Sequence, residues 1–85
     1  MDVVYSVEVW MRDGESWRWS AIGAYPSFDM ALSVGEGFLS AKPYRVRRVA
    51  GVGDGLRGFL AEEVHANDMT RHMRLLREKL GHKGR

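Results

Sequence analysis

The first half of the chain contains two runs in which apolar and polar residues alternate. In residues 3–11 the odd positions are apolar and share one face of a strand: Val3, Tyr5, Val7, Val9 and Met11. Residues 17–25 form the second run, and Asp13-Gly14 between the runs supplies the glycine that a tight hairpin turn requires. This pattern predicts an antiparallel β-hairpin.

The two faces of the hairpin are assigned from its tryptophans. We assign the face that carries Trp17 and Trp19 to the core side. Trp10 then lies on the opposite face, near Arg18 and Ile22. These three residues are expected to form a partly exposed apolar patch.

A helix and a third strand are expected after the hairpin. Pro26-Ser27 ends the second strand, and Ser27 can cap a helix whose apolar residues recur at three- and four-residue spacing: Phe28, Ala31, Leu32, Gly35, Phe38 and Leu39. Gly35 lies on the inward face and permits a close approach to the sheet. Lys42-Pro43 ends the helix. Residues 44–49 form the third strand, with a bulge or an early end because Val46 and Val49 are three positions apart.

The C-terminal part of the chain is expected to be helical. Two apolar stripes at helical spacing follow one another: Leu56, Leu60 and Val64, then Met69, Met73, Leu76 and Leu80. They predict a helix from about Phe59 that is kinked or broken near Asn67, and a clearer helix over 69–80. Gly81 is expected to stop this second helix and to leave residues 82–85 as a frayed tail.

Together these elements predict one α+β domain over residues 1–85. Residues 1–50 form a ββαβ core, in which one helix packs on the hairpin and the third strand. Residues 51–58 form a glycine-rich connector, and residues 59–81 form the C-terminal helical region. Within the connector, residues 53–58 match the G-x-G-x-x-G spacing of a dinucleotide-binding loop, but that motif requires a second parallel strand, so we interpret it as a flexible connector.

Charge is distributed unevenly along the chain. The net charge is +2, from 13 basic and 11 acidic residues. Residues 1–43 hold three basic and six acidic residues, whereas residues 44–85 hold ten basic and five acidic ones. From Met69 onward there are six basic residues and one acidic residue. Such a basic end can attract a phosphate backbone or an acidic protein surface.

Length and composition exclude several classes of protein. A chain of 85 residues allows one modest core, and the absence of cysteine excludes a disulfide framework and a thiolate zinc site. No segment approaches the roughly 20 apolar residues of a membrane span, and no basic segment precedes an apolar run at the N-terminus. We therefore expect a soluble cytoplasmic protein.

The sequence offers little for catalysis or metal binding. Glu62 and His65 are three apart, and Asp68 and His72 are four apart, as in helical metal sites, but a complete site needs further ligands. The serines occur only in turn, strand or cap contexts, without a nucleophile-elbow motif. We expect no enzyme activity, no metal and no cofactor, which leaves binding as the function class.

Two binding hypotheses follow, and we favour a protein partner. It would dock on the patch around Trp10 or on the outer face of the last helix, through Trp10, Arg18, Arg71, Arg74, Leu75 and Arg77. The stripe of Met69, Met73, Leu76 and Leu80 can pair with a second copy in a homodimer, although packing on the chain's own sheet is the favoured interpretation.

In the alternative hypothesis the basic residues track a nucleic-acid backbone. The surface would consist of Arg45, Arg47, Arg48, Arg71 and Arg74, together with the third arginine of the last helix, Arg77. Glu62, Glu63, Asp68 and Glu78 interrupt it, and the chain has no recognised reading helix or aromatic RNA motif. The sequence therefore favours protein binding over nucleic-acid binding.

Three segments in the first 50 residues resemble small ββαβ proteins encoded by phages and prophages. They are Trp10-Met11-Arg12-Asp13-Gly14, Ser27-Phe28 and Lys42-Pro43-Tyr44-Arg45-Val46. The resemblance implies a protein that blocks a host complex stoichiometrically, including nucleic-acid-handling defence complexes such as the CRISPR effectors. Inhibitors of that kind share no common motif, so the resemblance assigns no functional residue.

Overall fold

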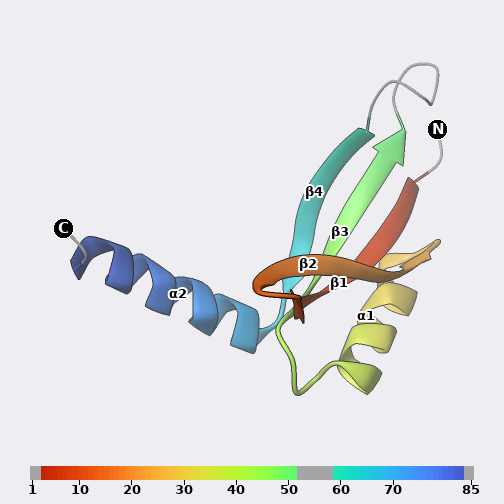
Figure 1. Cartoon of the computed structure of the whole chain (residues 1–85). Coiled ribbons are helices and arrows are strands. Elements are labelled where there is room, and N and C mark those ends of the chain that lie inside the picture. The colour runs from red at the N-terminus through yellow and green to blue at the C-terminus, as the bar shows by residue number, and fades with distance from the viewer. Residues whose placement is uncertain (1–2, 52–58, 84–85) are drawn as a thin grey trace.

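The chain forms a four-stranded antiparallel sheet and two helices (Figure 1). The structure is a computed structural model and describes residues 3–51 and 59–83. The strands are β1 (Val3–Asp13), β2 (Ser16–Tyr25), β3 (Tyr44–Gly51) and β4 (Phe59–Ala66), and the helices are α1 (Phe28–Phe38) and α2 (Asp68–Lys83). The sheet order is β2-β1-β3-β4, so β1 and β3 are central. The predicted α+β class is confirmed.

The hairpin forms where the alternating pattern predicts it. Asp13 pairs with Ser16 across a two-residue turn, in which Gly14 has a φ of +66°. Farther along, Val7 pairs with Gly23 but Glu8 pairs with Ala21, so Ile22 is an extra residue in β2. This bulge reverses the side-chain alternation of β2.

The register that the two-residue turn sets makes the predicted assignment of the tryptophans wrong. Trp10 pairs directly with Trp19, and their ring centroids are 5.3 Å apart on one face of the sheet. Because side chains alternate along a strand, Trp17 shares that face and Arg18 lies on the other. The Trp10, Arg18 and Ile22 patch is therefore not assembled. Trp17 is 55% exposed and is not a core residue.

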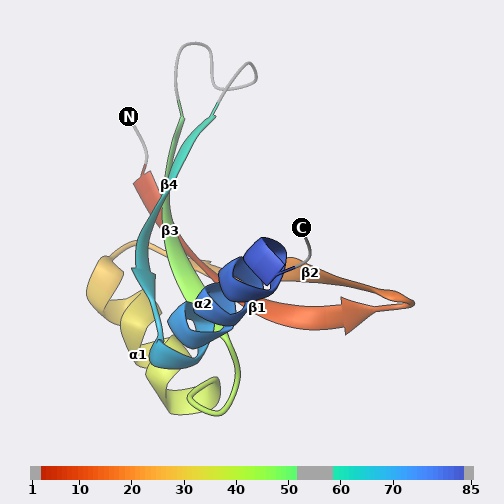
Figure 2. The ribbon, with the colours of Figure 1, turned by 90° about the vertical axis from the view of Figure 1, so that its left-hand side faces the viewer.

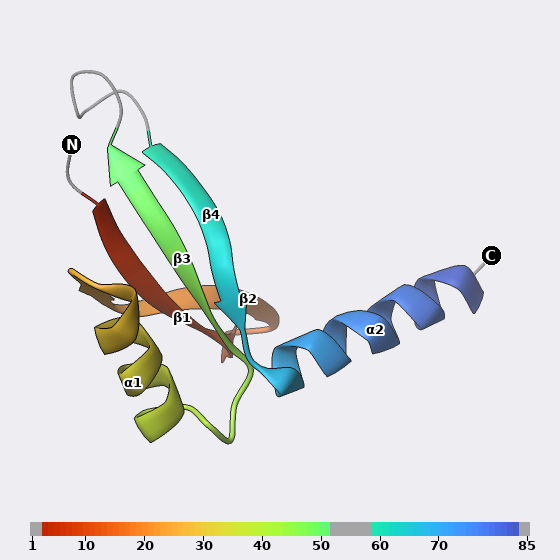
Figure 3. The same cartoon turned by 180° about the vertical axis from the view of Figure 1, so that it is seen from behind.

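α1 packs on the opposite face of the sheet and forms the core there (Figures 1 and 3). The buried apolar side chains come from β1, α1 and β3, with Leu39 directly after α1: Val7, Val9, Ala31, Leu39, Tyr44 and Val46. Ser27 caps α1, since its hydroxyl accepts a hydrogen bond from the Met30 amide at 3.2 Å. A Cβ atom at Gly35 would collide with the Tyr44 ring, which confirms the predicted close approach.

β4 replaces the helix predicted from Phe59, and that prediction is wrong. The spacing of Leu60 and Val64 fits a helix, but residues 59–66 pair with β3 along their whole length. Glu62 and Glu63 lie opposite Arg48 and Arg47, so opposite charges face each other across the strands. This stabilisation comes from residues that are distant in sequence, and local periodicity does not report it.

The predicted irregularity of the third strand occurs in its pairing with β4. Val46 pairs with His65 and Arg47 pairs with Glu63, which leaves Val64 as the extra residue. The bulge therefore lies on β4 rather than on β3. The connector carrying the G-x-G-x-x-G spacing falls largely on residues 52–58, which lie outside the described residues. Antiparallel strands flank it, whereas the dinucleotide motif requires a strand followed by a helix.

α2 extends away from the sheet (Figures 1 and 3), and Figure 2 views this helix nearly along its axis. It begins at Asp68 and continues through Gly81 to Lys83, so the predicted stop at Gly81 is wrong and the helix extends into the predicted tail of residues 82–85. Residues 84 and 85 of that tail lie outside the described residues. No helix in the described part of the chain is long and apolar enough to cross a membrane.

Candidate protein-interaction surface

The N-terminal end of α2 is attached to the start of β3 by polar contacts. The Asn67 carboxamide oxygen accepts hydrogen bonds from the amides of Thr70 at 3.0 Å and Tyr44 at 3.2 Å. The carboxamide nitrogen of Asn67 donates to the Lys42 carbonyl at 2.8 Å, and the buried Thr70 hydroxyl donates to the Tyr44 carbonyl at 2.9 Å. Asn67 is therefore the N-cap of α2 and also its anchor to the sheet.

One turn farther along, Arg74 connects α2 to β4. Its guanidinium donates two hydrogen bonds to the Glu63 carboxylate, at 2.6 and 2.7 Å, and lies 5.8 Å from the centroid of the Trp19 ring. These bonds hold the pKa of Glu63 below its ordinary value and raise the pKa of Arg74. Because the planar guanidinium and carboxylate are joined by two parallel bonds, the pair fixes the orientation of α2 relative to β4 as well as their separation.

The open face of the sheet holds a second set of charge pairs around Glu8. Its buried carboxylate accepts hydrogen bonds from Arg45 Nε at 2.8 Å and from Arg47 Nε at 2.9 Å. The Arg45 guanidinium also lies 4.4 Å from the centroid of the Trp19 ring. A buried carboxylate needs such partners, because leaving it unpaired would be very costly. Arg45 and Arg47 therefore have their charge partner, Glu8, within the sheet.

An apolar groove separates the hairpin from α2. It has a volume of about 660 Å³ and is lined by Trp10, Trp17, Pro43, Met73 and Arg77. The Trp10 amide donates to the Pro43 carbonyl at 3.0 Å, which holds the loop before β3 beside the hairpin. The Arg77 guanidinium lies 5.7 Å from the centroid of the Trp10 ring. The groove is therefore apolar along most of its wall, with one cation at its edge.

The apolar stripe of α2 continues outward from this groove. Thr70, Arg74 and Arg77, spaced by four and three residues, point toward the sheet, so the stripe of Met69, Met73, Leu76 and Leu80 lies along the side of the helix. Met73 is half-buried in the groove, while Met69 is 43%, Leu76 48% and Leu80 68% exposed. The favoured interpretation, that this stripe packs on the chain's own sheet, is wrong.

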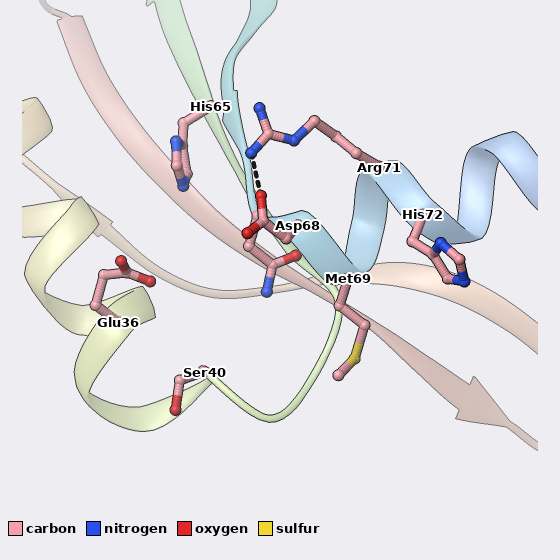
Figure 4. A pocket seen from close by; sticks show the side chains of 8 residues that line it. Glu36, Ser40, His65, Asp68, Met69, Arg71 and His72 are labelled. Atoms are coloured by element: carbon pink, nitrogen blue, oxygen red, sulfur yellow. Dashed lines mark hydrogen bonds and ion pairs between the residues drawn. The ribbon is translucent and has the colours of Figure 1, made fainter.

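A polar cleft lies on the other side of the N-terminal end of α2 (Figure 4). Glu36 from α1, His65 from β4 and Met69 from α2 line it, and its volume is about 610 Å³. The Tyr44 hydroxyl donates to Glu36 at 2.6 Å and lies 3.4 Å from His65 Nε2. Burial and the bond to Glu36 raise the pKa of Tyr44 far above its ordinary value. A tyrosine kept protonated in this way serves packing and hydrogen bonding rather than base catalysis.

The predicted metal-ligand pairs have other surroundings. Glu62 is on β4 within 3.7 Å of Arg48, and His65 faces Tyr44, so the two do not share a helix face. Asp68 forms an ion pair with Arg71. Within residues 3–51 and 59–83, no cluster of three or more histidine, cysteine, aspartate or glutamate side chains is placed to hold a metal ion.

The structure brings together only part of the predicted partner-binding set. Trp10 and Arg77 meet at the groove, and Arg74 reaches Trp19 near by. Leu75 is 57% exposed on the other side of α2, on the same side as Arg71. Arg18 is separate from all of them, and its Nε lies 3.1 Å from Asp13 at the hairpin turn.

Sequence reasoning missed two groove residues and one anchor. Trp17 and Pro43 both line the groove. The sequence pattern assigns Trp17 to the core side and Pro43 to the end of the first helix, so it identifies neither as a surface residue of this site. Glu63 carries the attachment of Arg74, but a predicted helix at Glu63 concealed its position beside α2. The position of Glu63 could have been identified by treating residues 59–66 as a strand whose glutamates pair with the arginines of β3.

Five arginines of the nucleic-acid hypothesis, all except Arg77, pair with carboxylates in the described ranges of this chain. Arg45 and Arg47 contact Glu8, and Arg48 contacts Glu62. On α2, Arg71 pairs with Asp68 and Arg74 with Glu63. Comparisons of the chain with protein-family models, curated proteins and solved structures find no match.

Proposed function

We propose that this protein is a non-enzymatic interaction module that binds another protein through α2 and the adjoining groove. The observation that carries the proposal is the exposed apolar stripe of α2, where Leu76 is 48% and Leu80 is 68% exposed. Large exposed apolar side chains that adjoin an apolar groove are typical of docking sites. The fold holds this stripe in place through polar contacts on a different side of the helix.

The pairing of the arginines supports a protein partner over a nucleic acid. A phosphate backbone would have to compete with Glu8 for Arg45 and Arg47, and with Glu63 for Arg74. Each such exchange gives up a charge-assisted bond that already exists. Aliphatic side chains along α2 also offer nothing to a phosphate backbone, whereas they fit the apolar centre of a protein interface.

The proposed biological role is stoichiometric blocking of a host complex. It rests on the resemblance of the first 50 residues to small phage-encoded proteins. A module that presents one helix and one groove can act by occupying a surface, without chemistry of its own. The excess of basic residues from Met69 onward would speed its association with an acidic target.

Affinity purification of the tagged protein from a bacterial lysate, with and without nuclease, tests the proposal. A single protein recovered in equal molar amount under both conditions is expected. The double variant Leu76→Ser/Leu80→Ser should lose that partner, whereas Leu75→Ser, on the other side of α2, should keep it. Recovery that disappears with nuclease would contradict the proposal and favour the nucleic-acid alternative.

A further inference from the structure

The groove between the hairpin and α2 contains one cation, the guanidinium of Arg77. Among the described residues, no carboxylate lies within ion-pair distance of Arg77, whereas Arg71 and Arg74 on the same helix are both paired. Its guanidinium stands over Trp10 at the edge of an otherwise apolar wall. Such a group can donate two parallel bonds to a carboxylate, and its position beside apolar side chains strengthens them.

The groove also offers space for an apolar side chain next to this cation. Trp17 and Met73 line it from the hairpin and from α2, and Trp17 is more than half exposed. A methionine and a tryptophan adapt to large aliphatic or aromatic groups, and burial of such a group is the main source of affinity at interfaces. One occupant can therefore use both features at once.

Charge decides which occupant fits. Residues 68–83 contain five basic and two acidic residues, so two copies of α2 side by side would bring like charges together. A nucleic acid would supply negative charge but would leave the aliphatic stripe beside the groove uncovered. An acidic protein segment with a large apolar side chain satisfies the cation, the groove and the stripe.

We propose that this groove binds an acidic protein segment, which inserts one large apolar side chain between Trp17 and Met73 and places a carboxylate on Arg77. The inference rests on the proposed function and specifies the chemistry of the partner. It also separates the roles of the arginines: Arg77 binds the partner, while Arg74 positions α2 through Glu63.

The test is a titration of the full ¹⁵N-labelled chain, followed by NMR, with a synthetic helical peptide of glutamate and alanine that carries one central leucine. The indole N–H signals of Trp10 and Trp17 should shift together with the amides of Met73 and Arg77. A peptide with glutamine for glutamate, and one with alanine for the leucine, should each bind more weakly.

Two variants with the same change of charge make the test specific. Arg77→Gln should weaken peptide binding about tenfold or more, because it removes a charge-assisted bond. Arg71→Gln, whose arginine pairs with Asp68 on another side of α2, should change it less than about threefold. If both variants lost the same amount of peptide affinity, the effect would be a non-specific attraction between the basic helix and the acidic peptide. That result would overturn the inference.

The remaining outcomes also decide the question. Dilution of the free protein that shifts the same tryptophan signals would identify a second copy as the occupant and overturn the inference. A single-stranded oligonucleotide of equal charge that shifts them more strongly than the peptide would do the same in favour of nucleic acid. If the signals stay fixed while the lysate partner still requires Leu76 and Leu80, the groove inference fails and the proposed function stands.

Discussion

The two helices of this protein are both amphipathic, but they are attached to the sheet in different ways. α1 buries Ala31 and Gly35 against Tyr44, so apolar packing holds it. α2 is held near its N-terminal end by Asn67 and Arg74, while its apolar stripe faces outward. The same sequence feature, an apolar stripe at helical spacing, therefore stabilises the fold in one case and remains exposed in the other.

This difference separates the part of the chain that folds the domain from the part that is available to a partner. A single helix of this length is marginally stable in water, so α2 depends on its cap and on the pair between Arg74 and Glu63. Its leucines are about half to two-thirds exposed and therefore contribute less to the fold than the buried side chains under α1. The comparison predicts that equivalent substitutions in the two regions have very different consequences.

The largest difference is expected between Tyr44 and Leu76. Tyr44→Ala should lower the free energy of unfolding by about 3–5 kcal/mol, because it empties the centre of the core under α1. Leu76→Ala should change it by less than about 0.5 kcal/mol, since that side chain is half exposed. Urea denaturation measures both. Similar losses in the two variants would mean that the α2 stripe is packed inside the domain.

A smaller effect is expected at the glycines of α1. Gly35→Ala should cost about 1–3 kcal/mol, because the new methyl group meets the Tyr44 ring. Gly37→Ala is the matched control, since nothing lies within 4 Å of its Cβ position, and it should stabilise the helix by up to about 1 kcal/mol. Thermal unfolding of both variants checks the prediction, and a stabilising Gly35→Ala would contradict the close approach.

At the start of α2 the expected cost is about 1 kcal/mol. Asn67→Ala removes the cap of the helix and its bonds to Lys42 and Tyr44. Asp68→Ala, a change at the neighbouring exposed position, should cost only a few tenths of a kcal/mol. Helix content by circular dichroism, followed during denaturation, distinguishes the two variants. Equal behaviour would show that Asn67 is not the anchor.

The smallest effects should appear at opposite ends of the pH range. The pKa of Glu63 is lowered from its ordinary 4.5, so its stabilisation of α2 is present above pH 4.5 and is lost as pH falls through the lowered value. The pKa of Tyr44 is raised from its ordinary 10.0, so its stabilisation of α1 is fully present below pH 10.0 and is lost as pH rises from there through the raised value.

NMR spectra across the pH range can separate these two transitions. Signals of carbon-bound protons in α2 should move in acid, and those in α1 should move in alkali. Glu63→Gln should abolish only the acid change around Arg74. An acid transition that persists unchanged in that variant would show that another group attaches α2.

Much of the first half of the fold is predictable because its signals are local. Gly14 sets the turn, Ser27 caps α1, and Gly35 allows contact with Tyr44. The bulge at Ile22 is different, because it depends on pairing between β1 and β2 and places Tyr25 on the opposite face from Trp17 and Trp19. The two-residue turn already places Trp19 opposite Trp10, so both tryptophans of β2 are misassigned when the faces are read without the register of the hairpin.

The second half was less predictable because distant residues determine it. Residues 59–66 form β4 only beside the arginines of β3, and their spacing alone favours a helix. The periodicity of α2 correctly identifies an apolar stripe, but it cannot say what the stripe faces. The sequence therefore predicts only part of the candidate site. It identifies Trp10 and Arg77 but not Trp17, Pro43 or Glu63.

Hydrogen exchange of the free protein, measured by NMR at two protein concentrations, tests the central claim most directly. The claim is that α2 is anchored near Asn67 and Arg74 and that its stripe faces solvent. The amides of α1 should exchange only through global unfolding, whereas those from about Leu76 onward should exchange much faster, through local opening, at both concentrations. Equal protection of the two helices in dilute solution would contradict the claim, because α2 would then be packed within its own chain.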